Sequence, residues 1–408
     1  MQCGLLGEKL GHSYSPQIHA KLGCYRYCLY EKSPSELEHF IRNGDYRGLN
    51  VTIPYKKTVL PYCDALSPEA SRLGAVNTLV RMSDGSLYGH NTDYFGFQSM
   101  AQRLNINYSG KKVLVLGSGG AATTVRAVME EQGANVVTVS RSGENNYKNL
   151  DLHKNCAVIV NATPVGMYPN NGMSPVNLSI FPNLEAVMDL IYNPAKTKLL
   201  LDAESMGLKT ENGLWMLVAQ AYESAKYFTR SFIDEALIPH IHRELKREME
   251  NIILIGMPGC GKSTNGRLLA KALNKQFVDA DEKIVELTGC SIPEIFQLHG
   301  EEYFRKLETQ ALTDICKGSG QVIATGGGCV TRPENIPLLH QNGTVIWIRR
   351  PVEQLPTAGR PLSQANDMNR MYEVRMPLYQ RCAHYTIDCG PSPEETVKRL
   401  ITLLDEVE

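Results

Sequence analysis

The feature that most constrains this chain is a glycine-rich loop, GMPGCGKS, at residues 256–263. It matches the P-loop pattern, in which two glycines separated by four residues are followed by Lys and Ser. The apolar run NIILI precedes the loop, and KSTNGRLLAKAL follows it with helical periodicity. Backbone N–H groups of such a loop cradle phosphates, so the sequence predicts a parallel-sheet domain that binds ATP and Mg²⁺. The predicted nucleotide-binding residues are Gly256, Gly259, Gly261, Lys262, Ser263 and Thr264, with Lys262 on the β- and γ-phosphates and Ser263 on the metal.

A second glycine loop, GSGGAA, lies at residues 117–122 between an expected strand at 111–116 and an expected helix. Its spacing fits the dinucleotide-binding fingerprint, whose glycines let the backbone approach a pyrophosphate at a helix N-terminus. The residues predicted to contact the cofactor here are Gly117, Gly119, Gly120 and Ala121. The alternative is a tight turn that binds no ligand.

The end of the next expected strand, residues 135–139, indicates which dinucleotide is bound. A cofactor with a free ribose 2′-hydroxyl favours Asp or Glu at this point. The chain instead has Ser140, Arg141 and Ser142. An arginine between two hydroxyls suits a 2′-phosphate, so NADP(H) is predicted rather than NAD. The alternative is a solvent-exposed arginine on a loop.

Further expected strands at 157–160, 185–192, 321–325 and 344–349 alternate with helical segments, which indicates parallel sheets and an α/β fold class. The amphipathic segment before the P-loop strand contains no Gly/Ser-rich linker, and we place a domain boundary near residue 249. We expect an N-terminal α/β substrate domain at 1–104, to which the chain returns with helices at about 213–249. A Rossmann domain at 105–212 and a P-loop domain at 250–408 complete the prediction.

The charge balance limits the possible partners. The 408 residues include 42 Lys and Arg and 43 Asp and Glu. This balance argues against non-specific binding to nucleic acid or to an anionic membrane. We find no apolar run of about 18 residues and no signal peptide, and we expect a cytoplasmic protein acting on small molecules. The eleven cysteines contain no C-x-x-C pair and are interpreted as reduced thiols. A metal site at Cys24 and Cys28 is the alternative, and the oligomeric state is not predicted.

Several polar clusters resemble shikimate dehydrogenase from residue 4 to about residue 240. They are HSYSP, NVTIPYK, GAVNT, GHNTDYFG, the GSGGAA loop, NATPVGM and NGLWMLVAQA, in the order expected for that family. The resemblance implies that Ser13 and Ser15 bind a carboxylate, that Thr52, Asn77 and Gln220 hold ring hydroxyls, and that Lys56 and Asp93 are the catalytic pair. Trp215 departs from the family, which often has a small residue near the nicotinamide.

The implied chemistry is reasonable for these residue types. Reduction of a ketone by hydride needs a proton on the forming alkoxide, and an ammonium group nearby stabilises the charge and supplies the proton. Lys56 has this capacity, and Asp93 can orient both Lys56 and the substrate hydroxyls. The adjacent Lys57 has no assigned role.

The second half of the chain, residues 252 to about 405, resembles shikimate kinase through FVDADEKIVELTG, IFQLHGEEYFRKLE, ATGGGCV, GRPL and RMPLYQRCA. The resemblance places Asp279 near Mg²⁺ and Asp281 on the hydroxyl that attacks ATP, and an aspartate that accepts the proton of this hydroxyl fits phosphoryl transfer. The other implied roles are a carboxylate clamp by Arg305 and Arg375, close backbone approach at Gly326, Gly327 and Gly328, ring packing by Phe296 and Phe304, and phosphate neutralisation by Arg360 on a lid. Pro356 stands about where many members have an arginine that stacks on adenine.

Together, the two resemblances predict a bifunctional enzyme. It would reduce 3-dehydroshikimate to shikimate with NADPH and then phosphorylate the 3-hydroxyl of shikimate with ATP. The alternative is a dehydrogenase joined to a catalytically silent kinase-like module that binds shikimate and regulates the first half. Use of quinate by the first half stays open.

Overall fold

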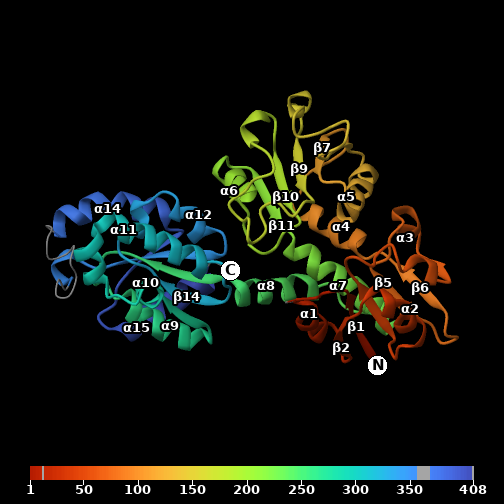
Figure 1. The fold of residues 1–408 in the computed structure, drawn as a ribbon, viewed down its shortest axis with the longest axis horizontal. Coiled ribbons are helices and arrows are strands. Elements are labelled where there is room, and N and C mark those ends of the chain that lie inside the picture. Colours follow the sequence, from red (N-terminus) through yellow and green to blue (C-terminus); the bar gives the residue numbers. More distant parts are fainter. Residues whose placement is uncertain (12, 356–367, 407–408) are drawn as a thin grey trace. The chain divides into compact units, whose positions relative to one another are not determined.

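A computed structural model describes residues 1–408 except residue 12, residues 356–367 and residues 407–408. The chain divides into two compact units, Met1–Leu245 and Lys246–Glu408. Both units combine helices with sheets, which confirms the α/β fold class (Figure 1). Within the described ranges, no helix is both long and apolar enough to cross a membrane.

The first sheet of unit 1 is mixed and lies at the N-terminal end of the chain. Its elements are β1 (Gln2–Gly7), α1 (Ser15–Leu22), β2 (Arg26–Glu31), α2 (Pro34–Asn43), β3 (Gly48–Val51), the 3₁₀ helix η1 (Leu60–Tyr62), β4 (Ala65–Leu66), α3 (Pro68–Leu73), β5 (Thr78–Arg81) and β6 (Leu87–His90). The strand order is β2-β1-β3-β5-β6-β4, with β1 parallel to β2 and β3 and with β5 antiparallel to β3 and β6. Leu6, Leu49 and Leu79 project from three of these strands into a core that α2 covers.

The second sheet of unit 1 is parallel throughout, in the order β11-β10-β9-β7-β8. Its elements are β7 (Lys112–Leu116), α5 (Gly120–Glu131), β8 (Asn135–Val139), η2 (Leu150–His153), β9 (Val158–Asn161), η3 (Leu178–Ile180), β10 (Ala186–Asp189), α6 (Lys198–Ser205) and β11 (Lys209–Asn212). The predicted strand at 185–192 ends early, at Asp189. Its carboxylate accepts the N–H of Ile191 at 3.1 Å, a local turn that stops the strand.

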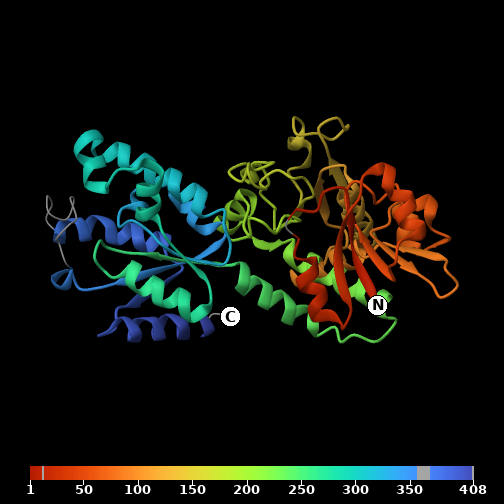
Figure 2. The same cartoon turned by 60° about the horizontal axis from the view of Figure 1, so that its bottom comes forward.

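Two long helices connect the sheets of unit 1. α4 (Asp93–Arg103) packs directly against α7 (Leu214–Thr229), and Gly96 permits the close approach. A Cβ on Gly96 would lie 2.8 Å from the carbonyl oxygen of Met216 and 3.0 Å from the Cβ of Gln220. α7 also packs against β3 and β5, as Figure 2 shows from a second side.

The helix α8 (Leu237–Met249) contains the division between the units, between Leu245 and Lys246. Leu245 is fully buried in an apolar cluster with residues of α1 and α7. The chain after the division is bonded within unit 2, where the ammonium group of Lys275 donates to the carbonyls of Arg247 at 2.6 Å and Glu250 at 2.9 Å.

Unit 2 is built on one parallel sheet in the order β13-β14-β12-β15-β16. Its elements are β12 (Asn251–Ile255), α9 (Lys262–Leu273), β13 (Gln276–Asp279), α10 (Ala280–Thr288), α11 (Ile292–Ile315), β14 (Gln321–Ala324), η4 (Cys329–Thr331), α12 (Asn335–His340), β15 (Gly343–Arg349), η5 (Val352–Gln354), α14 (Met368–Cys382), β16 (Tyr385–Asp388) and α15 (Pro393–Glu406). The predicted strands and the helix after the P-loop are confirmed.

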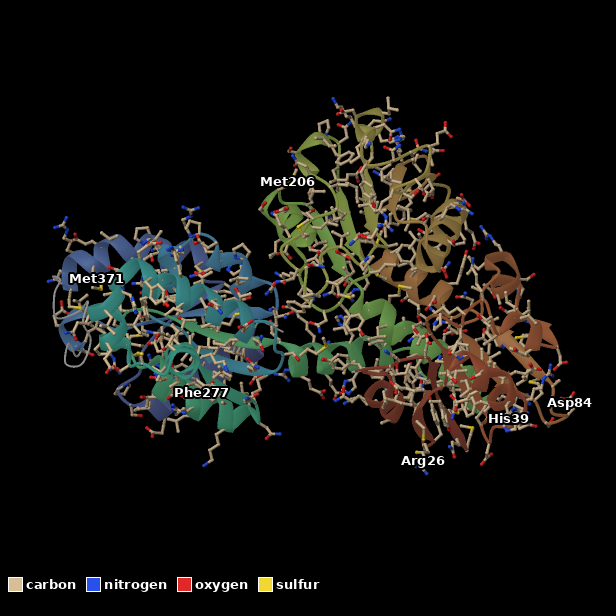
Figure 3. The ribbon with its side chains drawn as sticks, viewed as in Figure 1. Arg26, His39, Asp84, Met206, Phe277 and Met371 are labelled. Carbon is tan, nitrogen blue, oxygen red and sulfur yellow. The ribbon has the colours of Figure 1, made fainter. Side chains whose placement is uncertain are left out.

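Small residues let α9 lie close to the sheet of unit 2. A Cβ on Gly266 would lie 2.6 Å from the ring of Phe277, which is labelled in Figure 3. Because all strands of this sheet are parallel, their carboxyl ends meet at one edge. The P-loop follows β12 at that edge, as the sequence predicted.

Candidate active sites

Lys56 and Asp93 form an ion pair in unit 1. Lys56 lies in the turn after β3, and Asp93 is the first residue of α4. The Lys56 Nζ and Asp93 Oδ2 atoms are 2.5 Å apart, and both side chains keep some exposure, 31% for Lys56 and 15% for Asp93. The N–H of Val76 donates to the carbonyl of Lys56 at 2.8 Å and holds the turn in place. An ammonium group is therefore fixed where a small molecule can reach it.

Asn77 is hydrogen-bonded to the residue that precedes this aspartate. Its Oδ1 accepts the N–H of Thr92 at 2.7 Å, and its Nδ2 donates to the Thr92 Oγ1 at 3.1 Å. Asn77 is 3% exposed, so these bonds lie in a protected interior. They connect Asn77 to the start of α4, and so to the position of Asp93.

The remaining predicted substrate residues of unit 1 lie on three other elements. Ser13 Oγ accepts the N–H of Ser15 at 3.2 Å at the start of α1, and Ser15 is buried. Thr52 follows β3 and is half-buried, with its N–H bonded to the Leu6 carbonyl at 2.9 Å. Gln220 on α7 donates to the Leu217 carbonyl at 2.9 Å, so its amide group is folded onto its own helix.

The first glycine loop leads from β7 into α5. Gly117 has a φ of +112°, and a Cβ there would lie 3.0 Å from the Ala162 carbonyl oxygen, so glycine is required. A Cβ on Gly119 or Gly120 would meet no atom within 4 Å, and both residues and Ala121 are exposed. The start of α5 thus faces open space, which fits a pyrophosphate at a helix N-terminus.

The loop after β8 has the features expected for a 2′-phosphate site. The N–H of Ser140 donates to the Asn145 carbonyl at 3.1 Å and closes the loop. Arg141 and Ser142 are both exposed, and no carboxylate of the described residues forms an ion pair with Arg141. The donors of this loop therefore fit a phosphate group.

A cavity of about 460 Å³ opens at the carboxyl edge of the sheet in unit 2. It contains the P-loop residues Gly259, Gly261, Lys262, Ser263 and Thr264. The φ angles of Gly256, Gly259 and Gly261 are +145°, +83° and +98°, which other residues rarely adopt. Lys262 is 7% exposed, and its ammonium group donates to the carbonyls of Gly256 at 2.9 Å and Met257 at 3.0 Å.

Asp279 and Ser263 meet beside this cavity. The Ser263 hydroxyl donates to Asp279 Oδ2 at 2.6 Å, and Asp279 Oδ1 accepts the N–H of Asp281 at 3.0 Å. Asp279 therefore caps α10. A hydroxyl and a carboxylate next to a P-loop are oxygen ligands of the kind that Mg²⁺ prefers, with water and phosphate oxygens completing the shell.

Asp281, Glu308 and Arg305 form a charged group inside the cavity. Arg305 donates to Glu308 Oε2 at 2.9 Å, and Glu308 is fully buried. Asp281 Oδ1 is buried without a hydrogen-bond partner among the described residues. Burial, reinforced by the carboxylates of Glu308 and Asp279, raises the pKa of Asp281 to about 6. Burial also raises the pKa of Glu308. Asp281 is thus an acceptor whose protonation changes close to neutral pH.

The other predicted substrate residues line the same cavity as the P-loop. Arg375 donates to the Gly327 carbonyl at 3.2 Å, and a Cβ on Gly328 would overlap the guanidinium of Arg305. The rings of Phe296 and Phe304 pack with their centroids 4.7 Å apart. Arg305 and Arg375 are both largely buried beside the cavity, which suits the capture of a carboxylate. Gly326 lines the same wall. Arg360 and Pro356 lie outside the described residues.

Comparison with known proteins gives two matching family models. The model described as shikimate dehydrogenase substrate binding domain matches residues 5–79, and the model described as shikimate kinase matches residues 258–405. A shikimate dehydrogenase (NADP(+)) from Clostridium perfringens strain SM101 is 37% identical over 266 residues, covering 60% of this chain and 97% of that protein. The chain belongs to the shikimate dehydrogenase family. A shikimate kinase domain is fused to the dehydrogenase.

Solved structures agree with the assignment of the dehydrogenase unit. Shikimate dehydrogenase 1 from Peptoclostridium difficile is 42% identical, with a TM-score of 0.55, and covers 60% of this chain and 97% of that chain. A chorismate mutase/shikimate 5-dehydrogenase fusion protein from Clostridium acetobutylicum is 37% identical, with a TM-score of 0.57 and the same two coverages. The shikimate 5-dehydrogenase from Thermus thermophilus in complex with NADP(H) and shikimate is 30% identical, with a TM-score of 0.55, over 60% of this chain and 99% of that chain.

Trp215 is held inside the dehydrogenase unit by specific contacts. Its indole N–H donates to Ser99 Oγ at 2.8 Å, and the guanidinium of Arg103 lies 4.0 Å from the ring centroid. The ring packs at the margin of two apolar clusters, one around α4 and α5 and one around α7 and α8. These contacts explain why a large residue is accommodated. Its position relative to a nicotinamide stays a prediction.

Two residues that bear on these sites were not predicted from the sequence. Thr92 ties Asn77 to α4 in the dehydrogenase, and Glu308 pairs with Arg305 in the kinase. Each carried a signal, because Thr92 precedes Asp93 in GHNTD and Glu308 follows Arg305 by three residues, a spacing that places two side chains on one face of a helix such as α11. Both residues are buried, so their hydrogen bonds are shielded from water, and sequence spacing alone does not show this burial.

Proposed function

We propose that this chain catalyses two consecutive reactions. Unit 1 reduces 3-dehydroshikimate to shikimate with NADPH, and unit 2 phosphorylates the 3-hydroxyl of shikimate with ATP. The observation that carries the proposal is that each unit holds its own reactive group in place. The Lys56–Asp93 pair lies in unit 1, and Asp281 lies in the P-loop cavity of unit 2. The product of the first reaction is the substrate of the second.

In the dehydrogenase, bound NADPH supplies the hydride. The ammonium group of Lys56 stabilises the negative charge that develops on the substrate oxygen and delivers a proton to it. Asp93 keeps Lys56 oriented through the 2.5 Å contact. Ser13 and Ser15 bind the carboxylate, while Thr52, Asn77 and Gln220 hold ring hydroxyls. Since Gln220 now bonds to Leu217, its amide must rotate to reach the substrate.

The NADP(H) preference is supported by the exposed Arg141 between two serines and by the names of the relatives. A guanidinium and two hydroxyls offer several donors to a 2′-phosphate. The open N-terminus of α5 takes the pyrophosphate.

In the kinase, bound ATP supplies the phosphoryl group, and Ser263 and Asp279 would hold Mg²⁺. Asp281 accepts the proton of the attacking hydroxyl, and its raised pKa makes it a better base than an ordinary aspartate. Arg305 and Arg375 bind the carboxylate of shikimate. Lys262, which now donates to the loop carbonyls, would bind the β- and γ-phosphates. The role of Arg360 in neutralising the phosphates belongs to the same proposal.

We place both reactions in the cytoplasm and expect no nucleic-acid or membrane partner. The near-equal numbers of acidic and basic residues support this expectation, as do eleven cysteines that are all free thiols. The two substrates are small molecules, and their recognition needs no extended surface.

The test is a two-part assay on the purified full chain. NADPH oxidation is followed with 3-dehydroshikimate, and ADP formation is then followed with shikimate. We expect both signals, each dependent on its own substrate. NADPH oxidation without ADP formation would support the silent kinase-like module instead, and faster turnover with quinate and NADP⁺ than with shikimate would reassign the first half.

A further inference from the structure

The strand order of unit 2 arranges the groups of the cavity along a line. Asp281 follows β13, Gly326 and its neighbours follow β14, and the P-loop follows β12. β15 and β16 continue the sheet on the other side of the P-loop. The substrate-binding groups thus occupy one end of the edge. The nucleotide must extend from the P-loop toward the ends of β15 and β16, because its terminal phosphate has to face Asp281.

Arg350 is the first residue after β15, and it lines the same cavity as Gly259 and Gly261. Its side chain is half-buried and interacts with the thiol of Cys389, which follows β16. Cys389 in turn donates to the carbonyl of Cys260 in the P-loop at 3.3 Å. Arg350 is therefore positioned beside the P-loop through a second residue and does not extend freely into solvent.

The charge of Arg350 is not neutralised by any carboxylate of the described residues. Its neighbour Arg349 differs, because its guanidinium bonds both oxygens of Asp388 at 2.8 Å on the exposed side of the sheet. Successive side chains of a strand point to opposite sides, so one arginine is paired between two strands and the next lines the cavity. A guanidinium with free donors beside a P-loop favours an anionic oxygen as its partner.

We propose that Arg350 binds the phosphate chain of the nucleotide on the side away from Asp281, at its α- and β-phosphates. This assignment rests on the kinase activity proposed above. ATP and ADP share these phosphates, so Arg350 contributes to the binding of both and little to the transferred γ-phosphoryl group. It is a specific binding residue of the nucleotide site, on the opposite side of the P-loop from the arginines that clamp the substrate carboxylate.

The experiment uses the full chain and three variants, Arg350→Ala, Arg350→Lys and Arg349→Ala. ADP affinity is measured by calorimetry, and KM for ATP and KM for shikimate are measured by ADP formation. Arg350→Ala should weaken ADP binding and raise the KM for ATP by a similar factor, about ten- to a hundredfold for a lost charge-assisted contact. KM for shikimate and the rate of NADPH oxidation should stay unchanged, the latter serving as the folding control.

The other two variants test whether the charge of Arg350 or its guanidinium shape matters, and whether loss of any arginine at this strand end disturbs ADP binding. Arg350→Lys should restore part of the ADP affinity, because an ammonium still attracts phosphate. Arg349→Ala should leave ADP affinity unchanged. Loss of ATP affinity with normal ADP affinity would overturn the proposal in favour of a γ-phosphate contact, and no recovery with lysine would overturn it in favour of stacking on the base. Calorimetry measures ADP binding without any turnover. If the chain binds ADP but converts no ATP to ADP in the presence of shikimate, the proposed kinase activity is refuted, and the calorimetry still tests Arg350.

Discussion

The contact between Lys56 and Asp93 joins residues 37 positions apart and is more informative about chemistry than about stability. Both groups remain partly exposed, and ion pairs screened by water contribute little to folding. The turn that carries Lys56 is instead held by backbone bonds such as that from Val76. Removal of the Lys56 side chain should therefore affect the reaction while the fold is kept.

Lys56→Ala should lower kcat for NADPH-dependent reduction by roughly two or more orders of magnitude, because the forming alkoxide loses its cation and its proton donor. The measurement is steady-state NADPH oxidation with 3-dehydroshikimate. Lys57→Ala is a matched control, since Lys57 is the exposed neighbour, and it should behave as wild type. Near-normal kcat in Lys56→Ala, or an equal loss in both variants, would remove Lys56 from the mechanism.

The kinase reaction should depend on the ionisation of Asp281. The acceptor must be deprotonated, and its pKa is raised to about 6, so kcat/KM for shikimate should fall as pH decreases through about 6. Glu308 is one cause of this increase. Glu308→Gln should therefore lower the pKa of Asp281 and move the acid limb of the pH profile to lower pH.

Glu301→Gln provides the control for this prediction. Glu301 also accepts a bond from Arg305, at 2.9 Å, but its side chain is 49% exposed and is not among the causes of the Asp281 shift. Its pH profile should keep the wild-type midpoint. If the midpoint of the pH profile shifts equally in the Glu308 and Glu301 variants, the shift would come from Arg305 and not from the charge of Glu308.

At the scale of elements, the P-loop lies where the sequence predicted, at the end of a parallel strand. This prediction came from a motif, because a P-loop lies between the end of a strand and the start of a helix. The Asp189 turn in β10 was missed because an apolar run does not show where a side chain will bond to its own backbone. The pairing of Glu308 with Arg305 was missed because helical spacing does not distinguish a buried face from an exposed one.

The loop after β8 should determine the choice between NADPH and NADH. Arg141→Ala should raise KM for NADPH by roughly ten- to more than a hundredfold, because a charge-assisted contact to the 2′-phosphate is lost. KM for NADH should hardly change, and the ratio of the two values is the readout. Arg126→Ala is the control, because Arg126 is an exposed arginine on α5 that faces Glu130. An unchanged cofactor ratio in Arg141→Ala would refute the assignment.

At the scale of the whole molecule, each unit has its own core and its own reactive groups, so the two activities should be separable. Fragments 1–245 and 246–408 should reduce 3-dehydroshikimate and phosphorylate shikimate, respectively. In the full chain, Asp281→Asn should abolish ADP formation and spare NADPH oxidation. A soluble, folded fragment 246–408 without kinase activity would show that unit 1 supplies something essential.

The position of the cut should matter, and this provides a second measurement. Fragment 250–408 lacks the Arg247 and Glu248 carbonyls that accept from Lys275. It should have a lower midpoint of thermal unfolding than fragment 246–408, because a half-buried donor loses two of its three carbonyl partners and keeps only Glu250. Equal midpoints would show that the last turn of α8 contributes nothing to unit 2. The domain limits at 104 and 212 stay predictions.

The Lys275 contacts also affect the order of events during synthesis. A helix ends with carbonyls that have no partner within the helix, and here a lysine encoded later in the chain supplies the donor. Once α8 has emerged from the ribosome, its first turns can pack against α1 and α7, but its final carbonyls still face water. Domains fold in order as they emerge. The end of α8 therefore becomes fixed only after Lys275, beyond α9, has emerged as well.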